Sequence, residues 1–470
     1  MAETLETRRR SDQARDLGIY DEDGFVDSDF LKRIEALVEA EDAATLKSLV
    51  EPLHESELGD ILETVDATPR QGLVSLLGED FDYAALTEVD EAIRLSIVEA
   101  MPNPQIAAAL GELDSDDAVY ILEDIEEEDR KEILAALPFR ERMRLRRSLE
   151  YPEESAGRRM QTEFVAVPPY WSVGQTIDYM REDEDLPTSF AQIFVVDPML
   201  KLIGAVELDR ILRAKRPEKI EDIMHDTRHA IPAEMDQEEA AQIIEQYDLL
   251  SAAVVDQGER LVGVLTIDDV IDIVQAEAEE DIKRLGGVGD EEISDTVLTA
   301  VRSRFTWLMV NLATAILASL VIGLFDATIQ QMVALAVLMP IVASMGGNAG
   351  TQTMTVAVRA LASRDIDLRN AGRIIRRESL IGLLNGVLFA IVIGIVAAVW
   401  FQNPGLGQVI AIAMIVNMIA AALAGILIPL VLDNLGADPA LASGTFVTTV
   451  TDVVGFFAFL GLAAWWFGLG

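Results

Sequence analysis

Residues 443–457, SGTFVTTVTDVVGFF, open the last apolar segment of the chain and carry an acidic residue well inside it. Asp452 is the only acid after Asp438. A carboxylate at membrane depth costs roughly 2.5–3.5 kcal/mol on insertion scales, so it normally faces a bundle interior or a water-filled path. Hydroxyls precede it closely, at Thr445, Thr448, Thr449 and Thr451. The stretch indicates either a packing helix that tolerates one acid or an ion path.

The charge of the chain is very unevenly distributed. The first 300 residues carry 73 acids against 29 bases, whereas residues 301–470 carry seven acids and eight arginines. The acidic part argues against a nucleic-acid partner, because phosphate binding needs Lys and Arg, and it favours cations. Adaptation to high salt is a rival cause of the bulk acidity, because only seven residues are Lys. The absence of Cys excludes disulfides and thiolate metal sites.

The acidic part begins with a segment, residues 1–28, that we expect to be poorly ordered, followed by an acidic helical N domain at 29–150. Apolar and charged positions near 62–77 recur about sixty residues later, which predicts an α-helical superhelix of stacked pairs. Asp114, Asp116 and Asp117 stand at a predicted helix start, where capping is the alternative to metal binding.

Residues 151–271 contain a second duplication. The run beginning Phe194-Val-Val-Asp matches the run beginning Ala253-Val-Val-Asp at an offset of 59, and each copy reads strand, turn, strand, helix. This order, found twice, resembles a pair of α/β CBS domains. CBS pairs often bind adenosine nucleotides through a Gly-x-x-Thr-x-x-Asp run, so the resemblance implies possible ATP binding at Thr266 and Asp269. Helix capping is the alternative role for both residues.

Residues 272–300 are predicted to form a connecting helix and linker, with an apolar stripe and acids on its other faces. A solvated surface is the default interpretation of these acids, and a lever before the membrane part is the alternative. Residues 301–470 then form a predicted transmembrane bundle of five α-helical spans, near 305–325, 332–358, 379–401, 408–432 and 445–468.

Six arginines between spans two and three place the N-terminal domains in the cytoplasm and the C-terminus outside, by the positive-inside rule. The chain is therefore predicted to be a multi-pass protein of the cell membrane, with the lipid bilayer as a partner. No Gly-x-x-x-x-Gly-Lys run is present, so we expect a passive protein that is not an enzyme.

The second span carries a run rich in glycine and oxygen donors, MPIVASMGGNAGTQT at residues 339–353. Its glycines allow close helix approach or local unwinding. Asn348, Thr351 and Gln352 add side-chain oxygens. Hard oxygen ligands suit Mg²⁺ or Ca²⁺, and a path with few charges suits a hydrated Mg²⁺ ion.

Taken together, the chain resembles the MgtE family of magnesium channels. The run at residues 340–352 and the segment at 438–452 carry the resemblance most specifically. It implies a homodimer that conducts Mg²⁺ through a pore lined by spans two and five, with pore candidates Asp452, Asn348, Gly347, Thr351, Thr448 and Thr445.

The resemblance also implies that cytosolic Mg²⁺ closes the pore by binding between the N domain, the CBS pair and the connecting plug helix. The regulatory candidates are Asp116, Glu238, Asp248, Asp269, Asp272, Glu277, Glu280 and Asp281. One position departs from the family pattern, because Tyr120 stands where a second N-domain acid is expected. Alternatives are a transporter of another divalent cation such as Co²⁺ or Mn²⁺, or a nucleotide-sensing receptor whose spans only anchor it.

Overall fold

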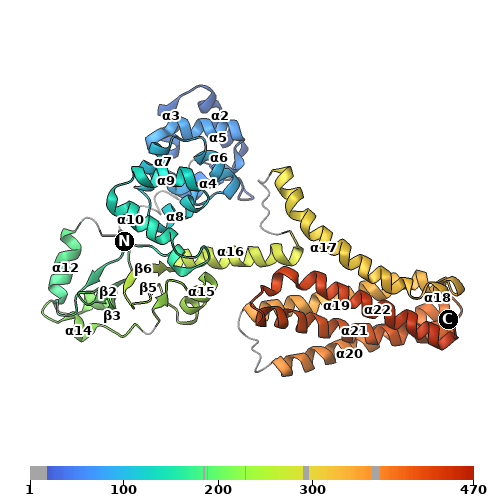
Figure 1. The fold of residues 1–470 in the computed structure, drawn as a ribbon. Coiled ribbons are helices and arrows are strands. Elements are labelled where there is room, and N and C mark those ends of the chain that lie inside the picture. Colours follow the sequence, from blue (N-terminus) through green and yellow to red (C-terminus); the bar gives the residue numbers. More distant parts are fainter. Residues whose placement is uncertain are drawn as a thin grey trace. The chain divides into compact units, whose positions relative to one another are not determined.

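The computed structural model describes residues 18–183, 186–187, 189–227, 229–288, 296–362 and 371–469. The chain divides into two compact units, Met1–Glu277 and Ala278–Gly470 (Figure 1). Each unit has its own packing and is described by itself.

The first unit begins with short helices around one hydrophobic core. These helices are α2 (Ser28–Glu39), α3 (Ala43–Val50), α4 (Glu55–Thr64), α5 (Ala67–Leu77), α6 (Glu91–Val98), α7 (Asn103–Leu110), α8 (Ser115–Glu123), α9 (Glu127–Ala136) and α10 (Phe139–Leu149). Polar caps define their starts. Asp27 accepts bonds from two backbone amides of α2, and Asp42 accepts one from Thr45 in α3.

Order in this unit begins earlier than the sequence indicated. Residues 1–28 were expected to be poorly ordered, but Ile19 is fully buried in the helical core, and Tyr20 pairs with Val26. The reason is that burial of a single apolar side chain in the helical core can order an otherwise charged segment. Residues 1–17 lie outside the described residues.

The duplicated segment forms two three-stranded sheets of identical topology. The first sheet has the order β1 (Ala166–Val167), β2 (Gln192–Val196), β3 (Leu202–Glu207), and the second has β4 (Ile231–Pro232), β5 (Ser251–Val255), β6 (Leu261–Thr266). In each, the first pair is parallel and the second antiparallel, with a register shift at the same place. The helices between and around the strands are α11 (Ala156–Arg159), α12 (Val173–Glu182), α13 (Leu208–Arg213), α14 (Ile220–Ile223) and α15 (Gln237–Gln246).

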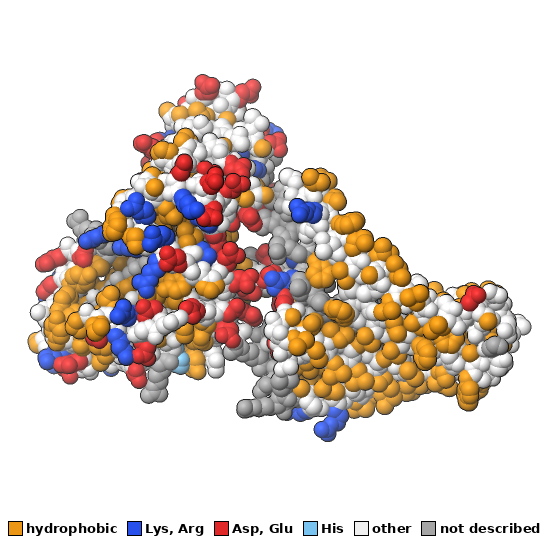
Figure 2. Space-filling view, in the orientation of Figure 1, with side chains coloured by type: hydrophobic (Ala, Val, Ile, Leu, Met, Phe, Trp, Pro, Cys, Tyr) orange, Lys and Arg blue, Asp and Glu red, His pale blue; other side chains and the backbone are white. Residues whose placement is uncertain are grey.

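Helix α16 (Ile267–Gly286) follows β6 directly and runs for 20 residues, from the first unit into the second. The second unit consists of α17 (Val297–Gly323), α18 (Asp326–Gln331), α19 (Ala334–Ala362), α20 (Ala371–Trp400), α21 (Pro404–Asn434) and α22 (Pro439–Phe467). Five of the described helices are long and apolar enough to cross a membrane. Figure 2 shows hydrophobic side chains over most of the visible face of these helices.

Helix α21 lies at the centre of this bundle, because 61% of its most apolar window is buried, against 6–33% for the other four spans. It packs against α19, α20 and α22. The predicted fold class is thereby confirmed: a helical N-terminal domain, two small CBS-type sheets and five apolar helices. The first helix extends past its predicted span, since α17 starts at Val297, and the segment between the first two predicted spans contains the short helix α18.

Candidate functional site

Asp452 lies on α22, half-buried, and it hydrogen-bonds no other described residue. Thr448 lies one turn earlier on the same helix, and its hydroxyl donates to the carbonyl of Gly444 at 3.0 Å. Thr451 is buried and donates to the carbonyl of Thr448 at 2.9 Å. The hydroxyls near Asp452 therefore donate their hydrogen bonds to backbone carbonyls of α22, and their oxygen lone pairs stay available as acceptors.

Helix α19 runs unbroken through the Gly-Gly-Asn run, so close approach, not unwinding, is the use of these glycines. A Cβ at Gly350 would lie 2.5 Å from Val447 Cγ1 on α22, which only glycine avoids. Gly347 has more room, because a Cβ there would meet only Thr448 Cγ2, at 3.9 Å. Gly347 and Thr448 thus face each other across α19 and α22.

One stripe of α19 is polar and exposed in the single chain. Its members recur at helical spacing: Ser344, Asn348, Thr351, Gln352 and Thr355. Asn348 donates to the Ser344 hydroxyl at 3.5 Å, and Thr355 donates to the carbonyl of Thr351 at 3.0 Å. Polar side chains in a membrane helix usually face a bundle interior or water, so this stripe is a candidate wall of a water-filled path.

Thr445 has a different environment from the other predicted pore residues. Its hydroxyl donates to Oδ1 of Asn311 on α17 at 2.8 Å. Asn311 is one of the intramembrane asparagines, and here it ties α17 to α22. The structure thus brings Gly347 and Thr448 together, places Asn348 and Thr351 on the exposed stripe, and turns Thr445 towards α17.

The start of α22 contacts the end of α16 within the second unit. Arg284 Nη1 lies 2.5 Å from Oδ2 of Asp438, the N-cap residue of α22, and Arg284 also pairs with Glu280. Burial, and then the charge of Asp438, raise the pKa of Asp281. Glu280 and Asp281, two predicted regulatory acids, therefore lie beside the cap of the helix that carries Asp452.

In the first unit, acids at the starts of α8 and α16 converge. Burial raises the pKa of Asp116 well above its usual range, the charge of Asp269 adds to this, and their carboxyls are hydrogen-bonded. Burial, followed by the charge of Asp269, raises the pKa of Asp117 to about 7. Burial likewise raises the pKa of Asp269 to about 6. Ionising all three carboxyls together is therefore unfavourable unless a cation is present.

The capping alternative applies differently to the residues of this cluster. Asp114 occupies the N-cap position of α8 but makes no side-chain capping bond. Asp269 Oδ2, by contrast, accepts bonds from the backbone amide of Thr266, at 3.2 Å, and from its hydroxyl. Thr266 and Asp269 thus form a local cap at the start of α16, which positions Asp269 toward α8.

These residues line a cavity of about 970 Å³. Asp116, Asp117, Asp269 and Asp272 contribute to its wall, as does Thr266. One carboxylate oxygen, Asp116 Oδ1, is buried and has no hydrogen-bond partner among the described residues. Orphaned acid oxygens around a roomy cavity fit a hydrated divalent cation, which needs few direct ligands. Among the described residues, no group of three His, Cys, Asp or Glu is close enough to ligate an ion directly.

The other predicted regulatory residues do not line this cavity. Glu238 is in the first turn of α15, and Asp248 is exposed after that helix in a backbone conformation with φ of 52°. Glu277 on α16 accepts a hydrogen bond from Gln237 Nε2 at 2.6 Å. The structure therefore groups three of the eight regulatory candidates, Asp116, Asp269 and Asp272, around one cavity.

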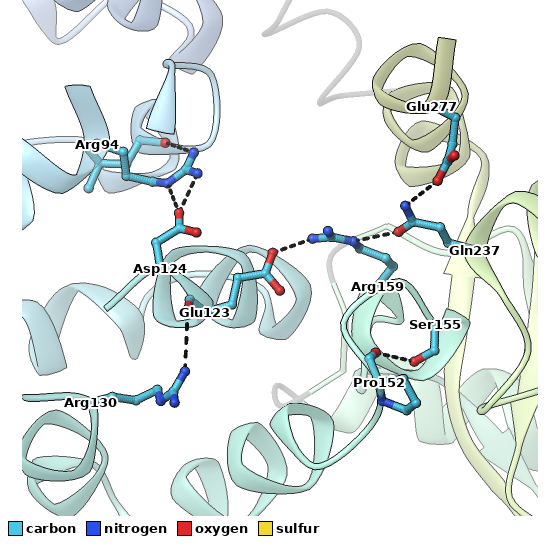
Figure 3. Close-up of polar contacts among 10 residues, drawn as sticks. Arg94, Glu123, Asp124, Arg130, Pro152, Ser155, Arg159, Gln237 and Glu277 are labelled. Carbon is cyan, nitrogen blue, oxygen red and sulfur yellow. Dashed lines mark hydrogen bonds and ion pairs between the residues drawn. The ribbon is translucent and has the colours of Figure 1, made fainter. Parts of the chain in front are cut away.

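Sequence reasoning missed a cationic network between the helical domain and the CBS pair (Figure 3). Arg159 Nη1 lies 2.8 Å from Glu123 Oε1, and Arg159 Nε donates to Gln237 Oε1 at 3.0 Å. Gln237 continues the chain of contacts to Glu277 on α16. Burial raises the pKa of Glu123 despite the charge of Arg159, and within the described part of the chain Glu123 Oε2 has no hydrogen-bond partner.

Tyr120 lies at the centre of this network. The guanidinium of Arg94 is 4.3 Å from the Tyr120 ring centroid, and that of Arg159 is 5.4 Å from it. An aromatic ring in contact with two arginine guanidinium groups thus occupies the position where a second N-domain acid was expected. Tyr120 was the one sequence signal for the network, because it departed from the family pattern.

Residues 339–462 match the MgtE family, described as divalent cation transporters, 53–154 match the MgtE intracellular N domain, and 156–216 and 220–276 match the CBS domain. The magnesium transporter MgtE of Enterococcus faecalis is 36% identical over 316 residues, covering 67% of this chain and 70% of that protein. This chain belongs to the MgtE family of magnesium transporters. The predicted resemblance is thereby confirmed.

The MgtE protein of Thermus thermophilus is similar over nearly the whole length, with 30% identity over 438 residues, or 91% of this chain and 96% of that one. A crystal structure of the soluble part of a magnesium transporter is 26% identical and covers 53% of this chain and 99% of its own, with a TM-score of 0.47. These MgtE relatives are named as transporters, not as enzymes. Membership and five apolar helices make this chain a multi-pass membrane protein.

Proposed function

We propose that this chain forms a Mg²⁺-selective channel that imports magnesium across the cell membrane and closes when Mg²⁺ binds between its acidic cytosolic domains. The observation that carries the proposal is the polar stripe of α19 together with the half-buried Asp452 of α22, which hydrogen-bonds no other described residue. Exposing both to lipid is unfavourable, whereas a water-filled path satisfies both.

A homodimer is the simplest way to complete this path. In a two-fold arrangement the same α19 and α22 surfaces of two chains face each other, so two Asp452 carboxylates face one ion. One or two carboxylates with amide and hydroxyl oxygens suit Mg²⁺ that keeps most of its water. Binding through water is weak enough to release the ion, as conduction requires.

Closure by Mg²⁺ is supported by the acid cluster around the cavity. The raised pKa values of Asp117 and Asp269 report that burial opposes their ionisation, as do the charge of Asp269 on Asp117 and the charge of Asp268 on Asp269. A divalent cation offsets that repulsion, so it favours the compact arrangement in which the acids converge. Mg²⁺ therefore acts as a ligand that shifts a two-state equilibrium by its differential affinity.

ATP is a second proposed ligand of the same cavity. Thr266 and Asp269 retain the residues of the CBS nucleotide run, and both line the cavity beside apolar side chains such as Phe194 and Ile273. The N-terminal domains are proposed to face the cytoplasm, as the arginines between spans two and three indicate.

Magnesium uptake tests the proposal in cells that lack their own magnesium systems. We expect wild type to restore growth and Mg²⁺ uptake, and Asp452→Asn to abolish both while the protein still reaches the membrane. Asp326→Asn is the matched control, because Asp326 is an exposed acid of the same unit that only accepts a bond from Gln330. Undiminished uptake by Asp452→Asn would refute the pore.

Selectivity is measured in the same cells by competition. We expect Ca²⁺, Mn²⁺ and Co²⁺ in excess to reduce Mg²⁺ uptake weakly. Stronger inhibition by Co²⁺ or Mn²⁺ than by unlabelled Mg²⁺ identifies a transporter of another divalent cation instead.

A further inference from the structure

Asn417 is an amide buried at the centre of the membrane unit. It lies midway along α21, the most buried span, and its side chain is fully inaccessible. Its Nδ2 donates to the backbone carbonyl of Val342 on α19 at 2.8 Å. Its Oδ1 is buried and has no hydrogen-bond partner among the described residues. A polar group held this way in an apolar bundle needs a reason beyond packing.

The amide of Asn417 fills a slot between two glycines on different helices. A Cβ at Gly346 of α19 would lie 2.2 Å from Asn417 Nδ2 and 2.8 Å from its Cγ. A Cβ at Gly455 of α22 would lie 2.8 Å from Nδ2 and 3.0 Å from Cγ. The distances to Nδ2 are shorter than real Cβ atoms show, so at both positions a residue with a Cβ would displace the amide.

The two glycines belong to the two helices that carry the candidate ion path. Gly346 directly precedes Gly347 and Asn348 on α19, and Gly455 follows Asp452 by three residues on α22. Asn417 itself is outside the path, because its side chain is inaccessible. The amide therefore contacts α19 and α22, the two helices of the candidate path, without lying in the path itself.

We infer that Asn417 is a positioning residue for ion permeation: its amide sets the spacing between the Gly347–Asn348 segment of α19 and Asp452 on α22. The inference rests on the proposed channel function and adds a specificity determinant to it. A hydrated ion is discriminated by how far apart its oxygen ligands stand, so a spacer that fixes this distance tunes selectivity. The hydrogen bond to Val342 also fixes the rotation of α19, and hence where Asn348 points.

A double-mutant cycle between Asn417 and Gly346 tests the inference. Gly346→Ala alone places a methyl group where the amide stands, so we expect Mg²⁺ flux to fall about tenfold or more. Asn417→Ala removes the amide and leaves space for that methyl group. Because residues in contact are coupled, we expect the flux of the double variant to recover to within about threefold of that of Asn417→Ala alone. The second cycle, Asn417→Ala with Gly455→Ala, keeps the test available if Gly346→Ala does not fold.

The readouts are the flux, the Mg²⁺ concentration that gives half-maximal flux, and the competition by Ca²⁺ and Co²⁺. If the role of Asn417 is purely structural, Asn417→Ala changes protein yield and Tm but leaves the half-maximal Mg²⁺ concentration and the competition by Ca²⁺ and Co²⁺ unaltered. If Asn417 sets the helix spacing, Asn417→Ala changes the half-maximal concentration and the competition at normal protein yield. Gly323→Ala is the matched control, because a Cβ there meets no atom within 4 Å.

Two results overturn the inference. One is an additive cycle, in which the double variant is as poor as the product of the single changes. The other is unaltered half-saturation and competition in Asn417→Ala. Either result, obtained while Asp452→Asn still abolishes flux, refutes the positioning role alone. Normal flux in Asp452→Asn refutes the channel proposal itself.

Discussion

Replacing Arg159 with Gln removes the side chain that joins Glu123 of the helical domain to Gln237 of the CBS pair (Figure 3). The same guanidinium lies 5.4 Å from the centroid of the Tyr120 ring. The side chain of Arg159 is 25% exposed and that of Glu123 is 15% exposed, so the pair is largely but not wholly buried. Glutamine keeps a hydrogen-bonding group at this position but has neither the charge nor the reach of the guanidinium.

The expected loss follows from this burial. Breaking a fully buried pair by removing one partner costs about 3–5 kcal/mol, and the partial exposure of Arg159 reduces the figure to about 1.5–3 kcal/mol. At 1.4 kcal/mol for each factor of ten, the equilibrium for docking the helical domain on the CBS pair shifts about 10- to 150-fold toward the undocked state. Mg²⁺ has to supply the difference, so more of it is needed for docking.

Protease protection of the full-length protein, titrated with Mg²⁺, measures this shift. We expect the Mg²⁺ midpoint of Arg159→Gln to rise above that of wild type. Arg216→Gln is the control, because Arg216 pairs with Asp178 at 2.6 Å with both side chains about half exposed, and such a pair contributes about 0–1 kcal/mol. A midpoint for Arg159→Gln that matches the control contradicts the assigned role of the network.

Two further outcomes follow from the acids of the first unit. Because the folded pKa values of Asp117 (about 7) and Asp269 (about 6) are raised, their contribution to docking is complete below their unfolded values near 4 and is lost as the pH rises through 6 to 7. Protons therefore offset the repulsion between these acids in place of Mg²⁺, so the Mg²⁺ midpoint for protection should fall as the pH is lowered from 7.5 to 5.5; a midpoint that is flat over this range would exclude these acids. Separately, Asp124→Ala should destabilise the helical domain by about 3–5 kcal/mol in urea unfolding, because it strips Arg94, whose side chain is only 3% exposed, of its carboxylate partner; a loss below 1 kcal/mol contradicts this.

Local repetition made much of the fold predictable. The 59-residue offset between the two CBS copies aligns the sequence of β2 with that of β5 and the sequence of β3 with that of β6, because each copy contains its own strand, turn and strand. The five apolar helices were equally visible, since a bilayer core demands about twenty apolar residues in a row. Asp452 was recognisable for the same reason, because placing a charged side chain within the bilayer core is energetically unfavourable.

Features that depend on distant segments were not predictable. Whether the glycines of α19 unwind or pack was decided by Asn417 and Val447, which lie on other helices. The Arg159 network joins residues 36 and 78 positions apart, and no local pattern marks such a pairing. Ile19 was missed similarly, because its burial depends on the core it meets and not on its charged neighbours.

We propose that the chain conducts Mg²⁺ past Asp452 and closes when Mg²⁺ binds its acidic domains. The decisive experiment is to measure Mg²⁺ flux into liposomes that contain the purified full-length protein, with a membrane potential as the driving force. We expect a flux that Asp452→Asn abolishes and that Mg²⁺ on the side of the acidic domains suppresses. A flux that persists in Asp452→Asn, or wild-type protein that carries no Mg²⁺ at all, contradicts it.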